Sequence, residues 1–403
     1  MINVYLTLAF DLLTLGLSIV FFWSTFVVLI GLIKPARKPP KAARKLKFAA
    51  LVCARNEEKV IKLPVKSILL AKYPAELREV IVLADNCTDA TAAVARAAGA
   101  TVWEKTVPSH GKGDVLTWGL EKLRVERPEV EAIAVFDADN ACADNWFAAI
   151  NDALNDGETV VTGRRSSSNA RSSLIAGWYT VYWAMMNELS NRVRTNLSLS
   201  GKLTGTGFAF LKSALEETGW HTETLVEDVE FTVQTNLRGG RVAYVPEADY
   251  TDEQPNEAVY MWRQLRRWAT GGWQVAQVYF VRWLKALKSR PSLRLFDSFF
   301  AILTGMSVAF ILLFNALALI VRLVYGSTQS PWTVFFGVFG FVFIMGWFTA
   351  IASVALSPNK RRPSWLAILT FPIFSLILSA AVLYTRVFPT RTWKPIPHGE
   401  GVP

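Results

Sequence analysis

The chain has 403 residues, 52% of them apolar, and a mean hydropathy of +0.26, which together exclude one ordinary domain and a purely soluble protein. Its net charge of +10 comes from basic residues that cluster beside apolar segments, so we expect a membrane surface rather than nucleic acid as a partner. The cysteines, Cys53, Cys87 and Cys142, are odd in number and lack metal-type spacing, which indicates free thiols in a reducing compartment.

The first apolar segment covers residues 4–33 and is interrupted only by Asp11. About 20 apolar residues suffice to cross a bilayer, so we expect a transmembrane helix. A cleaved signal peptide is the alternative, but no basic residue precedes the segment, it is too long, and no small-residue cleavage site follows. Basic residues without any acid occupy positions 34–47, and by the positive-inside bias they place residue 34 onward in the cytoplasm.

From residue 48 to about 164, short apolar runs alternate with helical patterns, which predicts a parallel, doubly wound α/β sheet. We expect strands at 48–54, 80–84, 101–103, 132–136 and 159–162, and helices at 57–70, 88–98, 113–123 and 144–154. Ligands bind such sheets at the carboxyl ends of the strands.

Polar clusters follow the first four strands and therefore fall on one edge of the predicted sheet. They are Arg55-Asn56-Glu57-Glu58, Asp85-Asn86-Cys87-Thr88-Asp89, Gly111-Lys112-Gly113 and Asp137-Ala138-Asp139. Each cluster alone also fits turn and helix-cap chemistry. The glycine and lysine cluster is not a Walker phosphate loop, because the upstream glycine spacing and the following Ser or Thr are missing. Together the four clusters favour a ligand site.

Asp137 and Asp139 are the candidate metal ligands, since two carboxylates one residue apart at a strand end suit a hard divalent cation. Mg²⁺ and Mn²⁺ prefer oxygen ligands and keep substrate phosphates in their coordination shell. Turn and cap chemistry at the strand end is the alternative for this pair as well.

Residues 165–204 begin as a polar segment and continue as an amphipathic one, whose aromatic residues we interpret as core packing. These are Trp178, Tyr179, Tyr182 and Trp183, followed by Met185 and Met186. The segment Gly205-Thr206-Gly207-Phe208 allows backbone to approach a ligand closely, although a tight turn into a strand explains it equally well.

Glu227 and Asp228 are adjacent carboxylates at the start of a predicted helix, where the helix dipole alone could favour them. A second helix, from about 257 to 285, contains Gln264-Leu265-Arg266-Arg267-Trp268. It is basic and rich in tryptophan, which is typical of a helix that lies in the membrane interface.

Apolar segments at 296–325 and 331–356 are long enough to cross a bilayer, and the stretch between them lacks basic residues, so it should lie outside. The last apolar segment, at about 364–388, has basic residues on both sides and contains Pro372. We therefore favour a re-entrant or interfacial segment over a crossing helix. The following tail, which includes Trp393 and Lys394, is a candidate gate over the donor site, and a snorkelling anchor is the alternative.

In this order Asp85, Asp137-Ala138-Asp139, Glu227-Asp228 and Gln264-x-x-Arg267-Trp268 resemble the membrane-bound processive glycosyltransferases of family 2. That family includes synthases of cellulose, hyaluronan, chitin oligosaccharides and poly-N-acetylglucosamine. The resemblance covers about residues 48–285 and implies a GT-A fold, a UDP-sugar donor and Mg²⁺ or Mn²⁺. The chain departs from cellulose synthases at Val226, where those enzymes have threonine.

The resemblance also implies a role for each motif residue. Asp85 would contact the uracil, Asp137 the ribose and diphosphate, and Asp139 the metal, while Arg55, Glu57 and Lys112 border the nucleotide. Gln264 and Arg267 would hold the diphosphate, and Trp268 would stack on the acceptor sugar, near the Gly205-Thr206-Gly207 segment. Asp228 would be the general base, with Glu227 beside it.

The chemistry needs the same residue types. A carboxylate must take the proton of the acceptor hydroxyl, and cationic groups must stabilise the departing UDP, so direct displacement predicts an inverted, β-linked product. We expect extension of a β-linked polysaccharide or oligosaccharide, coupled to secretion. The alternatives are a glycolipid synthase that adds one sugar, with a lipid as acceptor, and a non-catalytic membrane channel.

We expect a cell-membrane protein whose domains follow in this order: a transmembrane helix at 1–35, a cytosolic GT-A domain at 36–255, interfacial helices at 256–294, a transmembrane and re-entrant region at 295–390, and a cytosolic tail at 391–403. Membrane lipids are the expected partners besides donor and acceptor. The sequence leaves the sugar, the product length and the oligomeric state undetermined.

Overall fold

The computed structural model describes residues 2–35, 38–215, 219–325 and 330–390. The tail with the candidate gating residues Trp393 and Lys394 lies outside these ranges. Within them, one sheet has eight strands in the order β3-β2-β1-β4-β7-β6-β8-β5. The strands are β1 (Phe48–Ala54), β2 (Arg78–Asp85), β3 (Thr101–Lys105), β4 (Ala132–Asp137), β5 (Ala141–Cys142), β6 (Val160–Ser167), β7 (Phe208–Leu211) and β8 (Val242–Asp252).

The first half of the sheet is parallel, because β1 pairs in parallel with both β2 and β4, and β2 with β3. In the second half β7 runs antiparallel to its neighbours β4 and β6. The predicted doubly wound, mostly parallel α/β sheet is thus confirmed, with β7 reversed in the middle and the two-residue β5 antiparallel to β8 at the edge. That reversal brings the segment before β7, residues 202–207, to the carboxyl end of β4.

Helices cover both faces of the sheet, and the alternation of side chains in β1 divides the core accordingly. Ala50 and Val52 pack in the core beneath α2 (Lys62–Leu70), α3 (Thr91–Ala98) and α5 (Trp146–Asn155). Ala49 and Leu51 pack on the other face with α4 (Lys112–Glu126) and α8 (Glu227–Leu237). A strand that is buried on both faces has a continuous run of apolar residues in its sequence. For this reason the sequence predicted the parallel strands.

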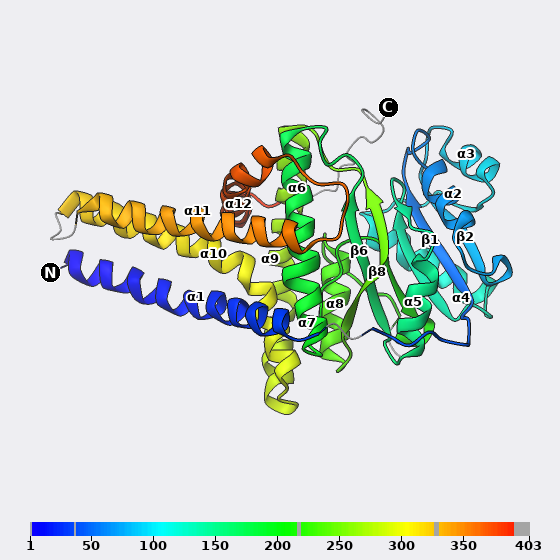
Figure 1. The fold of residues 1–403 in the computed structure, drawn as a ribbon, viewed down its shortest axis with the longest axis horizontal. Coiled ribbons are helices and arrows are strands. Elements are labelled where there is room, and N and C mark those ends of the chain that lie inside the picture. Colours follow the sequence, from blue (N-terminus) through cyan, green and yellow to red (C-terminus); the bar gives the residue numbers. More distant parts are fainter. Residues whose placement is uncertain (1, 36–37, 216–218, 326–329, 391–403) are drawn as a thin grey trace.

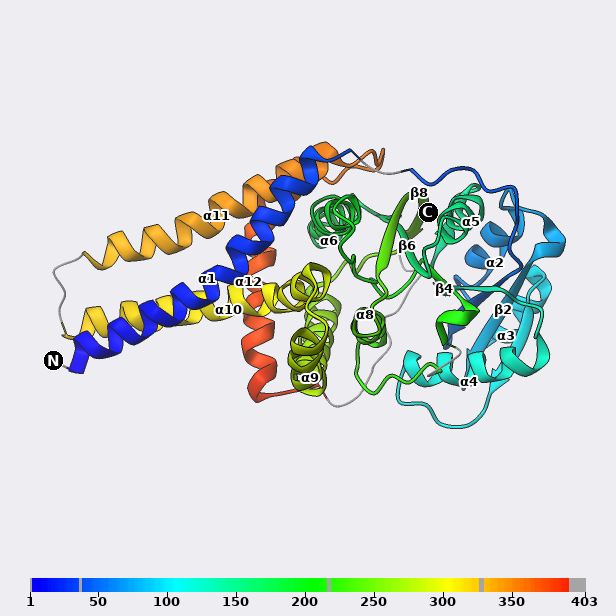
Figure 2. The same ribbon diagram turned by 90° about the horizontal axis from the view of Figure 1, so that it is seen from below.

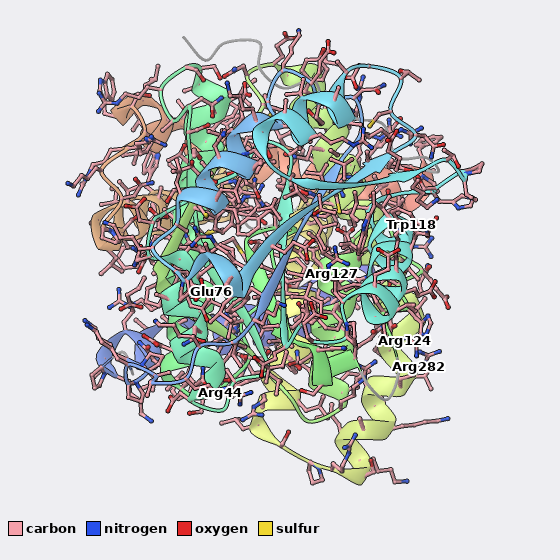
Figure 3. All side chains as sticks on the ribbon, turned by 90° about the vertical axis from the view of Figure 1, so that its right-hand side faces the viewer. Arg44, Glu76, Trp118, Arg124, Arg127 and Arg282 are labelled. Atoms are coloured by element: carbon pink, nitrogen blue, oxygen red, sulfur yellow. The ribbon has the colours of Figure 1, made fainter. Side chains whose placement is uncertain are left out.

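Three long helices extend away from the sheet and the helices that cover it as a bundle: α1 (Ile2–Ile33), α10 (Leu293–Tyr325) and α11 (Pro331–Leu356) (Figure 1). The N-terminal end of α1 and the ends of α10 and α11 near residues 325–331 lie at the tip farthest from the sheet. The opposite end of the molecule presents charged side chains, among them Glu76, Arg124 and Arg127 (Figure 3).

A layer of helices separates the bundle from the sheet. It contains α6 (Leu174–Met185), which continues through the π-helical turn η2 (Met186–Arg192) into α7 (Val193–Asn196), and α9 (Ala258–Ser289). The last helix, α12 (Trp365–Val387), crosses the direction of α1, α10 and α11 and packs on α6 and α9 (Figure 2). The indole N–H groups of Trp178 and Trp273 bond Thr370 and the Val382 carbonyl across these contacts.

Among the described residues, three helices are long and apolar enough to cross a membrane: Tyr5–Ile33 in α1, Leu293–Tyr325 and Trp365–Val387. In α11 the apolar stretch Gly340–Leu356 is shorter than these three helices. α12 lies crosswise to α1, α10 and α11, and its length and composition permit a crossing, so the re-entrant or interfacial position of this segment stays a prediction. Phe280, Val281 and Leu284 are exposed on the distal part of α9 beside Arg282, as an interfacial helix requires.

Asp297 of α10 joins the bundle to the helix layer over the sheet and is fully buried. Its carboxylate accepts hydrogen bonds from the Arg194 guanidinium of α7 at 2.9 Å and from the Trp23 indole N–H of α1 at 3.0 Å. α1 also passes so close to α7 that a Cβ on Gly31 would lie 2.5 Å from the Cβ of Val193. These contacts hold the bundle against α7 and the helix layer to which α7 belongs.

Candidate functional site

A cavity of about 730 Å³ lies between the carboxyl edge of the sheet and helix α9. Its walls come from the start of α4, the segment 202–205, the segment 222–229 at the start of α8, and α6 and α9. Eight of the residues singled out in the sequence line it: Lys112, Asp137, Gly205, Glu227, Asp228, Gln264, Arg267 and Trp268. Motifs that are up to about 150 residues apart in the chain therefore meet in one place.

Lys112 and Asp137 form an ion pair on the sheet side of the cavity, with the ammonium 2.5 Å from a carboxylate oxygen of Asp137 and 2.6 Å from the Gly205 carbonyl oxygen. Burial opposes the charge on Lys112, but Asp137, Cys53 and Glu227 outweigh it and hold the pKa of Lys112 above its usual range. The cavity thus contains a permanent cation where the polar end of β4 faces it.

Asp139 lies behind Asp137 and is largely buried. Its carboxylate accepts hydrogen bonds from the Glu253 backbone N–H at 3.0 Å and from the Asn140 side chain at 3.1 Å. The described residues contain no group of three or more His, Cys, Asp and Glu side chains that could hold a metal ion. A cation bound by Asp137 and Asp139 would take its other ligands from phosphate oxygens and water, as Mg²⁺ and Mn²⁺ do in nucleotide sites, so this donor set fits them.

Glu227 and Asp228 begin α8 and are both buried at the cavity wall. The preceding backbone is held by α9: the Leu225 N–H donates to the Gln274 side chain at 2.9 Å, and Arg267 donates to the Leu225 carbonyl at 3.2 Å. Burial, with the adjacent Asp228 carboxylate, raises the pKa of Glu227 from 4.5 to about 7. The proton that Glu227 retains relieves the repulsion between the two neighbouring carboxyl groups.

This shift predicts a pH-dependent stability. A carboxyl group whose pKa is raised on folding binds more protons in the folded than in the unfolded state, so the free energy of unfolding falls as pH rises from about 4.5 to about 7. We expect Glu227→Gln to melt at a progressively higher temperature than the natural protein as pH rises through that window. Thermal unfolding in detergent across the pH range measures it, and a constant difference would contradict the shift.

The close contact between α8 and α9 depends on Gly271. A Cβ at this position would lie 2.6 Å from both Cγ atoms of Val226, the residue before Glu227. We expect Gly271→Ala to displace the two carboxylates and to lower the turnover number about 10- to 100-fold, because ångström-scale misplacement of a catalytic group has that effect. Gly305→Ala in α10, where a Cβ meets nothing within 4 Å, is the matched control for the kinetic assay. Equal rates for the two variants would contradict the role of this contact.

α9 places three of the predicted residues, Gln264, Arg267 and Trp268, within about one turn of each other. The side-chain carbonyl oxygen of Gln264 is buried and has no hydrogen-bond partner in the described part of the chain, so it is available to a ligand. Trp268 packs at 5.8 Å, nearly parallel, on the ring of Tyr182 and edge-on at 5.6 Å on Trp183. Arg165 in turn lies 3.7 Å over Trp183 and pairs with Asp252.

The sequence interpretation of the aromatic segment as core packing is therefore incomplete. Tyr182, Trp183 and Met186 belong to a hydrophobic core between α6, α9 and α12, and they also line the cavity. Arg165, Lys202 and Gln274 are further lining residues that no motif indicated. Helical spacing of aromatic residues predicts a buried face but does not say that one edge of it borders a site.

Asp139 and two further groups of predicted residues lie outside the cavity wall. Asp85 is buried at the end of β2, where it accepts a 2.6 Å hydrogen bond from Ser109 and lies 3.7 Å from Arg55. Glu57 follows the neighbouring strand, with its backbone N–H bonded to Thr91. Cys53, at the end of β1, is the register partner of Asp137 in β4, so the residues that follow β1 adjoin the cavity. Burial raises the pKa of the Cys53 thiol to about 12.

Thr206 and Gly207 lie behind the residues that line the cavity and do not line it themselves. The Thr206 hydroxyl accepts a hydrogen bond from the Asp137 backbone N–H at 2.9 Å, and Gly207 has a positive φ of 62°. A Cβ on Gly207 would lie 2.0 Å from the Tyr250 ring, so only glycine fits there. The structure favours the alternative of a tight turn into β7 for these two residues, whereas Gly205 faces the cavity. Whether they bind an acceptor stays a prediction.

Comparisons with known proteins fit this arrangement. The model of the family described as "Glycosyltransferase like family 2" matches residues 45–271. A beta-monoglucosyldiacylglycerol synthase from Nostoc sp. (strain PCC 7120) is 28% identical over 260 residues, which cover 60% of this chain and 52% of that protein. A poly-beta-1,6-N-acetyl-D-glucosamine synthase from Staphylococcus aureus (strain COL) is 25% identical over 259 residues, which cover 63% and 61% respectively.

Among solved structures, the mannosyltransferase PcManGT from Pyrobaculum calidifontis, in complex with GDP-Man and Mn²⁺, matches 96% of this chain and 100% of its own with a TM-score of 0.64. At 17% sequence identity this likeness concerns the fold, and it confirms the predicted GT-A-type α/β domain with attached helices. The chain spans 52% and 61% of the lengths of the two curated relatives.

Proposed function

The chain belongs to the family 2 glycosyltransferases, and from this premise we propose that it transfers a sugar from a UDP-sugar to a hydroxyl group at the membrane surface, with inversion at the anomeric carbon. Membership of the family removes the alternative of a non-catalytic channel. The cytosolic position of the catalytic domain in the cell membrane is part of the proposal, and the basic residues at 34–47 support it.

The observation that carries the proposal is the position of Asp228 in one cavity with Lys112, Asp137 and Arg267. An acceptor hydroxyl is a poor nucleophile, so a carboxylate must take its proton while the oxygen attacks the anomeric carbon. Asp228 is the base in this proposal. Glu227, on the same turn of α8, has a pKa that burial raises above its usual value, and it serves to position the base.

The leaving group is a diphosphate, which needs positive charge and hydrogen-bond donors. Lys112 and Arg267 supply charge from two sides of the cavity, and Gln264 in the cavity wall would donate from its side-chain N–H₂ group. Asp137 and Asp139 would hold Mg²⁺ or Mn²⁺, which when bound neutralises charge on the diphosphate. Arg55, Glu57 and Asp85 adjoin this end and would border the base and ribose.

The acceptor end of the cavity leads toward the membrane helices, since its wall includes Gly272 of α9 and Ile302 of α10. We therefore propose a lipid or a lipid-linked sugar as acceptor, in place of the processive polymer synthesis that the sequence favoured. Extension of a β-linked glycan is the second candidate. The stacked wall of Trp268, Tyr182 and Trp183 supports it, because indole faces pack well on pyranose rings.

Purified full-length protein in lipid nanodiscs provides the test. Release of UDP is measured across a panel of UDP-sugars, with GDP-mannose as a rival donor, in Mg²⁺, Mn²⁺ or a chelator, and products are identified by mass spectrometry. One sugar added to lipid supports the first candidate, and a ladder of glycans supports the second. Turnover with GDP-mannose alone, or with equal rates in chelator, would contradict the proposed donor or the metal.

A further inference from the structure

Lys202 faces the catalytic cavity from the segment between α7 and β7, and the proposed chemistry assigns it no role. Its backbone is fixed, because its N–H donates to the Asn191 side chain at 2.9 Å and its carbonyl accepts from the same side chain at 3.0 Å. Its ammonium group makes no hydrogen bond or ion pair with any residue in the described ranges. A lysine held in this way at a cavity wall is available to a ligand.

The other cations of the cavity differ from Lys202 in this respect. Lys112 is paired with Asp137, Arg165 with Asp252, and Arg267 donates to a backbone carbonyl. Burial lowers the pKa of Lys202, and the charges that act on it come from Asp228, which stabilises the ammonium, and Arg194, which opposes it. An anion bound beside the ammonium would relieve this unfavourable burial.

Lys202 lines the same cavity as the apolar groups Met186, Val229 and Ile302. The charges that act on its ammonium come from Asp228, the proposed base, and from Arg194, which is bonded to Asp297 in α10. The cavity wall also includes Gly272 of α9, where an added Cβ would meet only the end of the Met306 side chain of α10, at 3.7 Å. An apolar chain that passes Gly272 and Ile302 would therefore lie between α9 and α10.

We propose that the acceptor is an anionic amphiphile: Lys202 binds its phosphate or carboxylate, its hydroxyl reaches Asp228, and its apolar chain leaves between α9 and α10 past Gly272 and Ile302. The proposal rests on the proposed function and names its acceptor class. In the transfer step the hydroxyl proton passes to Asp228, the acceptor oxygen bonds to the anomeric carbon, and the bond from that carbon to the diphosphate breaks. UDP leaves with the electron pair, and the anionic group of the acceptor is unchanged.

A binding measurement tests this without requiring turnover. The Asp228→Asn variant is placed in nanodiscs of neutral lipid, and native mass spectrometry measures binding of dioleoylphosphatidylglycerol against dioleoylglycerol. Both lipids carry a free hydroxyl and the same chains, and only the first carries a phosphate. We expect the anionic lipid to bind at least about tenfold more tightly, and Lys202→Gln in the same background to remove that difference.

Lys202→Arg is expected to retain the preference, and Lys66→Gln, on the exposed side of α2, is the matched control for loss of a lysine. Gly272→Leu would narrow the space for the chain and is expected to weaken both lipids alike. Equal binding of the two lipids, or a loss in Lys202→Gln that is the same for both, overturns the proposal. Preference for soluble uronate-containing oligosaccharides over the anionic lipid overturns it as well.

Transfer assays separate the two levels of the proposal. If no UDP-sugar supports transfer while Lys202 still decides lipid binding, the proposed function fails and the anionic site stands. If transfer occurs equally to neutral and anionic lipids, the proposed function stands and this inference fails. A change in the pH profile of the transfer rate in Lys202→Gln that is identical for every acceptor would mean that Lys202 acts only on the base Asp228 and does not bind the acceptor.

Discussion

Asp228→Asn is expected to lower the rate of sugar transfer by about 100- to 10,000-fold while the KM for the donor changes little. The amide has the same shape as the carboxylate but cannot accept the hydroxyl proton. Because Asp228 takes no part in the Lys112–Asp137 ion pair that the proposal places at the diphosphate, donor binding should persist. UDP release and donor affinity, measured on the same preparation, give both quantities.

Asp144→Asn is the matched control for this substitution. Asp144 makes an exposed ion pair with Lys72 far from the cavity wall, so its loss should leave transfer within about twofold of the natural rate. A transfer rate in Asp228→Asn above about a tenth of the natural one would remove Asp228 as the base. Glu227 would then be the candidate, because it is the neighbouring carboxyl group on the same turn of α8.

The second large effect concerns stability. Asp297→Ala removes the carboxylate that neutralises Arg194, whose side chain is only 6% exposed, and leaves the Trp23 indole N–H without its acceptor. An uncompensated buried charge of this kind destabilises a protein by about 3 to 5 kcal/mol. We expect a large fall of the melting temperature in detergent, because the Arg194–Asp297 ion pair no longer holds the bundle to the catalytic domain.

The double variant Arg194→Met with Asp297→Leu is the control, since it removes both charges and keeps apolar volume. Replacing a whole buried ion pair by apolar residues is often close to neutral, so the double variant should recover most of the lost stability. If it melts as low as Asp297→Ala, the hydrogen bond from Trp23, and not the buried charge, accounts for the loss.

Prediction from the sequence was most successful where one kind of interaction dominates. β1 and β4 are continuous apolar runs buried on both faces, and they were placed to within one residue. The polar residues that follow them had to meet, because parallel strands present their carboxyl ends at one edge. The residues 264–268 were assigned to an interfacial helix from composition, and α9 contains them.

Other features depend on contacts that no local pattern records. β8 contains Pro246 and charged residues, and its pairing with β6 shifts register after Gly163, so no regular alternation marked it as a strand. Lys202 belongs to no motif, and its position in the cavity follows from the two hydrogen bonds to Asn191 of η2. Thr206 and Gly207 were assigned by motif, whereas their contacts place them beneath the wall.

The attachment of α1 has a consequence for how the chain is made. The polar groups of this first helix find their partners very late: Trp23 bonds Asp297, 274 residues further on, and Ser24 bonds Thr304, 280 residues further on. In the proposed membrane topology, α1 therefore waits in the bilayer during synthesis with these groups unpaired while the catalytic domain folds. Completion of α10 then closes the molecule, so a ribosome that stalls before Asp297 leaves a helix exposed to quality control.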